Sequence, residues 1–561
     1  MKNILHLIIV CIICLCSKVS RSQQVVSEKL YVQTDRELYI PGETIWFRIF
    51  SVDASTLKPI DLSNIAYIEI IHESAPKAQA MIELKKGGGD GFIKIPEQTQ
   101  TGTYQLRAYT NWMKNFGTKH FYQKNLTIIS ASDRQPPSFQ NAMTQNENVS
   151  GMELQLSSAA IKRREHLNIN FQLPAGMTKA VLSATIFLID SASGGYSGSI
   201  HSLKENRPTG SFSNIRYLPE AKYHYVDALV RDTNPGSYAG DTAYLSVPGT
   251  TPMLYTARID SAGRARFMLH KLIYGSHKII VQVVHNNKHQ GNIEVLSPYF
   301  DEYEDSRSIN NRAEAIDINK RLIAQQTSLL MPLATDNLQD ASLRTHHSNL
   351  KDTSMFYGKA PFTYMLDDFT RFPTMEEVLR EYVIEVLVNR QGDKYSFTSI
   401  SRHKDGLPVV YRPISLLNGV PVSANTVIKV DPLKINRIDI IPRRYFYGSS
   451  FFDGIISLLT YDGSTGEIEF DNGVLPVDYN GLQLSETFAS PVYNSEQARG
   501  SRRADFRTTL QWLPFLKPDE NGKVQFDVYS SDLVGKYMIV VEGIDESGNI
   551  ISARKTFNVV K

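Results

Sequence analysis

One run of this sequence has residue types suited to binding chemistry, at residues 443–447. Two arginines precede three aromatic residues, in the order Arg443, Arg444, Tyr445, Phe446 and Tyr447. An arginine offers a planar charged fork and an aromatic ring buries a large area, so this composition is typical of the residues that dominate protein interfaces. The alternative is that the aromatic rings only cap the core of their own domain. Because the five residues cluster, we predict that they form a partner-binding site.

Other patterns that could support catalysis or bind a metal are incomplete. The glycine cluster of residues 87–91 could cradle a phosphate, but no Gly-Lys-Ser/Thr motif follows it, so a hairpin turn is the better interpretation. A nucleophile elbow would need glycine two residues after its serine, whereas Ser199 follows Ser197 at that position. Four histidines lie near one another in sequence without an acidic third ligand at useful spacing: His270, His277, His285 and His289. We therefore predict no catalytic, cofactor-binding or metal-binding residue. A hydrolase whose two carboxylates meet only in the fold stays open as an alternative.

The N-terminus predicts export. An almost unbroken apolar run covers residues 4–16, and the small-x-small pattern of residues 20–22 is typical of a cleavage site. The run is shorter than the roughly 20 apolar residues that a membrane-spanning helix needs. We expect a signal peptide at residues 1–22, no transmembrane segment in the mature chain, and a location in the periplasm or at the outer membrane. All three cysteines lie in this segment, so the mature chain would have no disulfide and no thiol nucleophile: Cys11, Cys14 and Cys16.

Length and composition indicate several folded domains. At roughly 150 residues per domain, 561 residues correspond to about four domains. Hydrophobic residues make up 42% of the chain and aromatic residues 10%, which is ordinary for globular protein and argues against wholesale disorder. The formal net charge is +2, and it becomes −1 without residues 1–22, which hold three basic residues and no acidic one. No nucleic-acid partner is expected from so balanced a charge.

Residues 29–50 have the pattern of strands around a turn, and their final strand alternates two sets of side chains. Ile45, Phe47 and Ile49 form one set, whereas Trp46, Arg48 and Phe50 form the other, as in a strand with one face on a core. The segments YVQTDRELYIPGETIWFRIF and GTYQLRAYTNWM resemble the macroglobulin (MG-type) domain of the alpha-2-macroglobulin superfamily, as found in bacterial envelope proteins. The resemblance implies immunoglobulin-like β-sandwiches that bind or space other proteins and have no catalysis of their own. The internal thioester of some macroglobulins needs a cysteine, which the mature chain would lack.

A second resemblance covers residues 369–461. Thr374 and Glu377 have the spacing of a helix-initiating capping box. After them come the segment LLNGVPV, a step at which Ile435 and Ile438 lie three apart on one expected helical face, and the glycines of FYG and FFDGIISLLT. This order resembles the plug domain of TonB-dependent outer-membrane receptors. The 100 residues after position 461 are too few for a receptor barrel, so a transporter is excluded. A plug without its barrel would expose the surface that the barrel covers, which favours residues 443–447 as a docking face.

The last part of the chain shows the macroglobulin resemblance again. Its segment LQWLPFLKPDENGKVQFDVYSSDLVGKYMIVVEG resembles a segment of alpha-2-macroglobulin relatives. The predicted fold class is mainly β, with tandem immunoglobulin-like or macroglobulin β-sandwiches and a small α+β plug-like domain. The expected order is a signal peptide at 1–22, a macroglobulin-type β-sandwich at 23–130, a linker at 131–150, a second β-sandwich at 151–216, a carboxypeptidase-regulatory or transthyretin-like β-sandwich at 217–297, a connector with a helix at 298–368, the plug-like domain at 369–461 and a C-terminal macroglobulin-like β-sandwich at 462–561.

These observations predict a non-enzymatic, exported adaptor or scaffold of the Gram-negative cell envelope. Its expected partner is an outer-membrane or cell-surface protein, and no cofactor is expected. Two alternatives stay open besides this interpretation. One is a hydrolase of glycans or peptides with accessory β domains. The other is a protease-binding macroglobulin without a thioester, which would need an exposed cleavable bait loop, and residues 191–214 are the one modest candidate for it.

Overall fold

The computed structural model describes residues 27–130, 152–177, 179–189, 196–205, 215–232, 234–285, 288–289, 292–303, 354–402, 408–448, 450–465 and 474–561. The predicted signal peptide, the predicted linker at 131–150 and the helix expected within 298–368 lie outside these residues. The described part is mainly β, which confirms the predicted fold class. It forms two compact units: the described residues within 1–219 and 487–561, with residue 303, belong to unit 1, and those within 220–302 and 354–486 belong to unit 2.

Unit 1 begins with a β-sandwich. One sheet has the strand order β1–β3–β6 and the other β2–β8–β7–β4–β5. The strands span β1 (Glu28–Thr34), β2 (Leu38–Tyr39), β3 (Thr44–Asp53), β4 (Ile65–His72), β5 (Ala75–Glu83), β6 (Gly88–Lys94), β7 (Gly102–Thr110) and β8 (Tyr122–Ile128), with short 3-10 turns at Trp112–Phe116 and Thr118–His120. Ile45, Phe47 and Ile49 fill the core, as their alternation predicts. The opposite face of β3 is covered as well, since Arg48 and Phe50 are buried.

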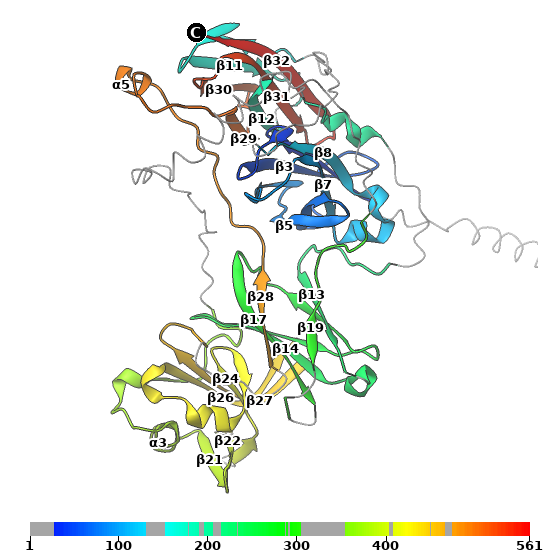
Figure 1. Cartoon of the computed structure of the whole chain (residues 1–561). Coiled ribbons are helices and arrows are strands. Elements are labelled where there is room, and N and C mark those ends of the chain that lie inside the picture. Colours follow the sequence, from blue (N-terminus) through cyan, green and yellow to red (C-terminus); the bar gives the residue numbers. More distant parts are fainter. Residues whose placement is uncertain are drawn as a thin grey trace, which may run out of the picture. The chain divides into compact units, whose positions relative to one another are not determined.

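The second sandwich of unit 1 combines two distant parts of the chain. Its sheets have the orders β10–β32–β31–β12–β29 and β30–β11–β9. Figure 1 shows strands from both parts of the chain, such as β11, β12, β30 and β31, together in this sandwich. Four strands come before residue 190 and four after residue 508: β9 (Gln155–Leu156), β10 (Ala160–Lys162), β11 (His166–Gln172), β12 (Val181–Ile189), β29 (Thr509–Leu516), β30 (Lys523–Tyr529), β31 (Gly535–Ile544) and β32 (Ile550–Val560). We call it the composite sandwich.

The composite sandwich differs from the sequence-based expectation of separate sandwiches at 151–216 and 462–561. β12 lies between β29 and β31, and β11 pairs with β30 over seven residues. Leu167, Ile169 and Phe171 accordingly share one core with Val524, Phe526 and Val528. Neither segment alone has enough strands to cover its apolar face, so each completes the other.

A buried polar joint connects the first sandwich to the composite sandwich. The Asp35 carboxylate accepts hydrogen bonds from Arg36 Nη1 at 2.6 Å, Tyr39 OH at 2.7 Å, Thr509 Oγ1 at 2.8 Å and the Trp46 amide at 3.0 Å. Thr185 Oγ1 donates to the backbone oxygen of Asp35 at 2.7 Å. β12 carries Thr185 and β29 carries Thr509. The Thr-Asp-Arg turn of the first sandwich is therefore hydrogen-bonded to two strands of the composite sandwich.

Unit 1 also contains three buried tyrosines and a partly buried one whose ionisation would oppose folding. Burial, with nearby carboxylates, raises the pKa of Tyr31, Tyr39, Tyr122 and Tyr196 well above the ordinary value of 10.0. The unfolded chain loses these protons near pH 10 while the folded chain keeps them, so stability is fully present below pH 10 and falls above it. We expect the urea midpoint of unit 1, followed by tryptophan fluorescence, to be lower at pH 11 than at pH 9. An equal midpoint at the two pH values would contradict this burial.

Unit 2 contains a third sandwich with sheets β16–β13–β19 and β15–β14–β17–β18, and β28 also pairs with β17. Its strands are β13 (His224–Val230), β14 (Thr242–Val247), β15 (Met253–Arg258), β16 (Arg264–Leu269), β17 (Ser276–His285), β18 (Lys288–His289), β19 (Ile293–Val295) and β28 (Val474–Asn480). β28 follows the plug-like segment in the chain yet completes this sheet (Figure 1). A buried hydrogen-bond network connects β28 to strand β13 of the opposite sheet. His224 of β13 bonds Glu220 at 2.8 Å and also bonds Tyr479 of β28.

The remainder of unit 2, which covers the segment predicted to be plug-like, is an α+β module. A five-stranded sheet has the order β20–β26–β27–β24–β25, and a smaller one has the order β21–β22–β23. The elements are β20 (Phe362–Met365), α3 (Met375–Glu381), β21 (Val386–Gln391), β22 (Lys394–Arg402), β23 (Pro408–Tyr411), β24 (Ile414–Leu417), β25 (Val420–Val422), α4 (Ala424–Lys429), β26 (Ile435–Tyr447) and β27 (Ser450–Thr460). The capping box predicted for Thr374 and Glu377 is present. Asn418 and Gly419 both have positive φ, which is typical of a two-residue hairpin turn.

The helical step predicted at Ile435 and Ile438 is wrong, because both residues lie in strand β26. A register shift between Ile435 and Arg437 lets both side chains point into the same core, which alternation alone would not allow. Across the described residues, no helix is long and apolar enough to cross a membrane.

Candidate functional site

The five predicted site residues lie at the end of β26, where it forms a long hairpin with β27. Across this hairpin Arg444 pairs with Asp453, Tyr445 with Phe452, Phe446 with Phe451 and Tyr447 with Ser450. Gly448 has a φ of 58°, a left-handed conformation that favours glycine in the connecting turn. A register shift between Ile441 and Arg444 precedes the tip and sets which side chains share a face.

Tyr445 and Tyr447 point toward the interior and fix the hairpin. The Tyr445 hydroxyl donates to the Phe356 oxygen at 3.1 Å, and the Tyr447 hydroxyl donates to the Leu254 oxygen at 2.7 Å. Both rings pack against the apolar cluster that contains Phe452. Burial raises the pKa of Tyr447 to about 12, so its hydroxyl stays a hydrogen-bond donor at physiological pH. Both residues are therefore structural: Tyr445 bonds a carbonyl next to its own module, and Tyr447 bonds β15 of the third sandwich.

The opposite face of the hairpin tip is exposed and combines charge with aromatic rings. Phe446 is 74% exposed and Phe451 is 49% exposed, with their ring centroids 6.3 Å apart. The Arg444 guanidinium lies over the Phe451 ring, 4.6 Å from its centroid, and its Nε contacts Asp453 at 2.7 Å. Arg443 is exposed as well. We call Arg444, Phe446 and Phe451 the tip patch.

Sequence reasoning missed Phe451 and Asp453 as members of this surface. They lie on the returning strand, and only the pairing register places them beside Phe446 and Arg444. A hairpin centred on the Gly448 turn would have indicated this pairing, because the residues flanking a tight turn face each other.

Tyr447 gives a way to separate anchoring from binding. Replacing Tyr447 by phenylalanine removes one donor and leaves the Leu254 oxygen without it, so we expect a loss of about 0.5–1.5 kcal/mol in the unfolding free energy. The measurement is the urea midpoint of the full chain, followed by circular dichroism. The exposed Tyr223→Phe variant is the matched control, and its urea midpoint should equal that of wild type. A Tyr447→Phe variant as stable as wild type would show that the hydroxyl does not hold the hairpin.

The other sequence candidates have local structural roles where the structure describes them. The glycine cluster begins at a tight turn, in which the Lys85 and Gly88 amides bond each other's carbonyls, and continues as strand β6. The hairpin predicted there is wrong, because β5 and β6 lie in different sheets. No group of His, Cys, Asp and Glu in the described ranges is arranged to hold a metal ion. Residues 196–205 form the described centre of the bait-loop candidate and are anchored, since Tyr196 is fully buried and the Gly198 amide bonds Glu37 at 3.0 Å.

Comparison with known proteins assigns the first sandwich. Residues 29–122 match the MG2 domain family. This region contains the Asp35 turn, β3 and β7, and it ends at the first residue of β8. The MG2 domain supports the predicted relation to the alpha-2-macroglobulin superfamily for this part of the chain.

Two solved structures resemble the chain at low similarity. The Salmonella alpha-2-macroglobulin mutant Y1175G is 9% identical, with a TM-score of 0.24, and the match covers 97% of this chain and 40% of that one. The native conformation of Escherichia coli alpha-2-macroglobulin is 10% identical, with a TM-score of 0.25 and coverage of 96% and 40%. The chain thus spans about 40% of the length of these two proteins. A search of curated proteins found no match.

Proposed function

We propose that this protein is an exported, non-enzymatic adaptor of the Gram-negative cell envelope. In this account the MG2 domain and the composite sandwich form a spacer, and the plug-like module carries the binding site. The partner is an outer-membrane or cell-surface protein.

The observation that carries the proposal is that the two faces of the hairpin tip have different roles. Two tyrosines hold the backbone from one side, so the exposed rings on the other side are presented on a fixed element rather than a loose loop. A preorganised site loses less conformational entropy on binding. Aromatic and arginine side chains are also the types that contribute most at protein interfaces.

The plug-like assignment of residues 369–461 belongs to the same proposal. A receptor plug is surrounded by its barrel, whereas the tip patch here is exposed. Exposed aromatic surface is costly to leave in water, and a partner protein that covers it relieves this cost.

Site-specific photocrosslinking tests the proposal. A photoreactive phenylalanine analogue replaces Phe446 in the full-length protein, expressed in a Gram-negative cell. We expect one dominant crosslinked protein in the outer-membrane fraction and a mature N-terminus near Gln23. The matched control places the analogue at Phe362, which is 40% exposed on the edge strand β20 of the same module. Equal crosslinking from both positions, or none from Phe446, would reject the hairpin as the binding site.

A further inference from the structure

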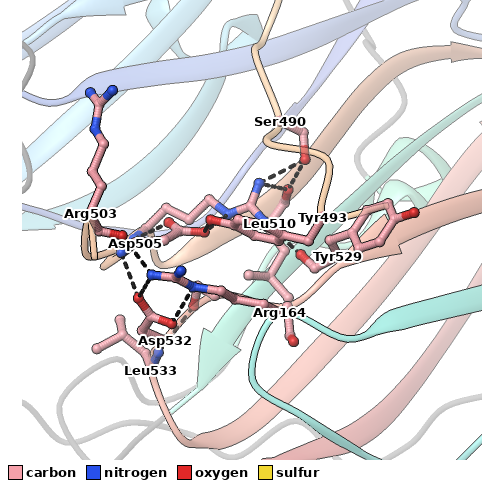
Figure 2. Close-up of polar contacts among 12 residues, drawn as sticks. Arg164, Ser490, Tyr493, Arg503, Asp505, Leu510, Tyr529, Asp532 and Leu533 are labelled. Carbon is pink, nitrogen blue, oxygen red and sulfur yellow. Dashed lines mark hydrogen bonds and ion pairs between the residues drawn. The ribbon is translucent and has the colours of Figure 1, made fainter. Parts of the chain in front are cut away.

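Arg164 of the composite sandwich organises a second exposed surface, distant in sequence from the hairpin. It lies between β10 and β11, is buried, and has a left-handed φ of 55° that is uncommon outside glycine. Its Nε and Nη2 contact the two carboxylate oxygens of Asp532 at 2.8 and 2.6 Å. The remaining donors bond three carbonyls, of Arg499 at 3.0 Å, Ser501 at 2.6 Å and Arg503 at 2.6 Å. Figure 2 shows Arg164 between Asp532 and Arg503. All five N–H groups of the guanidinium are therefore used.

Neighbouring contacts fix the same segment from its other side. The Asp505 amide donates to the Asp532 carboxylate at 2.8 Å, and the Tyr493 hydroxyl donates to the Asp505 carboxylate at 2.9 Å. Arg507 reaches the Tyr529 carbonyl at 2.6 Å and Ser490 Oγ at 2.7 Å. A stretch without strand pairing is thus held in one conformation by side chains.

The clamp binds the backbone of residues 499–503. The Arg499 Nε also donates to the Tyr493 carbonyl at 3.1 Å. Arg499, Arg502 and Arg503 are exposed, and in Figure 2 the Arg503 side chain points away from the network. Arg163, beside the clamp residue, is exposed too. We call Arg499, Arg502 and Arg503 the arginine loop.

Two exposed valines are sequence neighbours of residues in this network. Val492 is 58% exposed next to Tyr493, and Val534 is 43% exposed two residues after Asp532. A partner that carried only charge would use the arginines and leave the valines in water. A partner segment with both carboxylates and apolar side chains would use both kinds of group.

We propose that the arginine loop, held by the Arg164–Asp532 clamp, binds an acidic segment of a partner protein. Carboxylates pair with the guanidinium forks, often through two parallel hydrogen bonds, and the valines contact apolar side chains between the acids. The clamp keeps the arginines in a fixed arrangement, so a flexible basic tail of equal charge would bind such a segment less well. This surface lies in unit 1 and does not depend on the tip patch of unit 2.

The test uses the full mature chain and a short fluorescent peptide that alternates glutamate with valine. We expect saturable binding that weakens as salt is raised, and the double charge reversal Arg502→Glu with Arg503→Glu should weaken it by about tenfold or more. The matched control, Lys517→Glu with Lys523→Glu, makes the same charge change at exposed positions of the same sandwich and should stay within about twofold. Arg164→Met keeps the loop's arginines but removes the clamp, and it should also weaken binding while the chain stays folded by circular dichroism.

Three results would overturn the proposal. Equal losses in the two charge-reversal variants would mean that only net charge matters. Binding of polyphosphate or of phosphatidylglycerol vesicles as tight as that of the peptide, and equally sensitive to the Arg502 and Arg503 reversal, would assign the surface to phosphate groups instead. Unchanged affinity in the Arg502 and Arg503 reversal would reject the arginine loop. This third result decides the outcome even if Arg164→Met unfolds the chain.

Discussion

Replacing Asp35 by alanine is expected to destabilise unit 1 by about 3–5 kcal/mol, because it removes one partner from a buried, charged hydrogen-bond network. The Asp35 side chain is fully buried and accepts four hydrogen bonds. Without it, the Arg36 guanidinium keeps Glu43 at 2.6 Å but loses its second carboxylate, and the Trp46 amide loses its acceptor. The composite sandwich is affected as well, since its Thr509 loses the hydrogen bond to the same carboxylate.

The tryptophans make this prediction simple to measure. The chain has three, Trp46, Trp112 and Trp512, and all lie in unit 1. Their fluorescence during urea unfolding therefore follows unit 1 without a signal from unit 2. Asp527→Ala, at an exposed position of β30 in the same unit, is the matched control and should change the unfolding free energy by less than about 0.5 kcal/mol. If the unfolding free energy of Asp35→Ala lies within about 1 kcal/mol of the wild-type value, the polar joint does not stabilise the contact between the two sandwiches.

The second large effect is expected on binding. Replacing Phe446 and Phe451 together by alanine removes the exposed rings of the tip patch and leaves Tyr445 and Tyr447 in place. Truncating a residue at the centre of an interface costs about 2 kcal/mol or more, which corresponds to roughly 30-fold in affinity. The two rings are neighbours and their effects will not simply add, so we expect the double variant to lose about 30-fold or more.

Stability separates this result from a folding defect. Both side chains point outward, so the thermal melt of the double variant should stay within a few degrees of wild type. Phe362→Ala with Met365→Ala removes comparable exposed apolar surface from the edge strand β20, and the partner should bind it as it binds wild type. If the tip variant is folded and keeps full affinity, the binding site lies elsewhere.

The sequence predicted local features of the fold better than distant ones. Alternation along β3 predicted which side chains fill the first core, and the Thr374 capping box predicted where α3 begins. The composite sandwich could not be predicted in the same way, because β12 and its partners β29 and β31 lie more than 300 residues apart in sequence. Each half has ordinary strand patterns, and no local signal says which distant strand completes the sheet.

The candidate site shows the same limit at smaller scale. Composition singled out Arg443, Arg444, Tyr445, Phe446 and Tyr447 as a group, but the strand places Tyr445 and Tyr447 on one face and Arg444 and Phe446 on the other. A register shift near Ile441 decides which pair faces outward, and such a shift is not visible in the residue types. For this reason Tyr445 is an anchor and unsuited to a binding test, whereas Phe451 joins the surface.

Hydroxyl-radical footprinting of the wild-type full chain, with and without the partner that crosslinking identifies, tests the binding role of the hairpin most directly. Oxidation of a ring falls when a partner shields it from water. Our account predicts that Phe446 and Phe451 become protected on binding, while Phe362 in the same module is oxidised at an unchanged rate. Oxidation of Phe446 and Phe451 at the same rate in the free and the bound protein would contradict it.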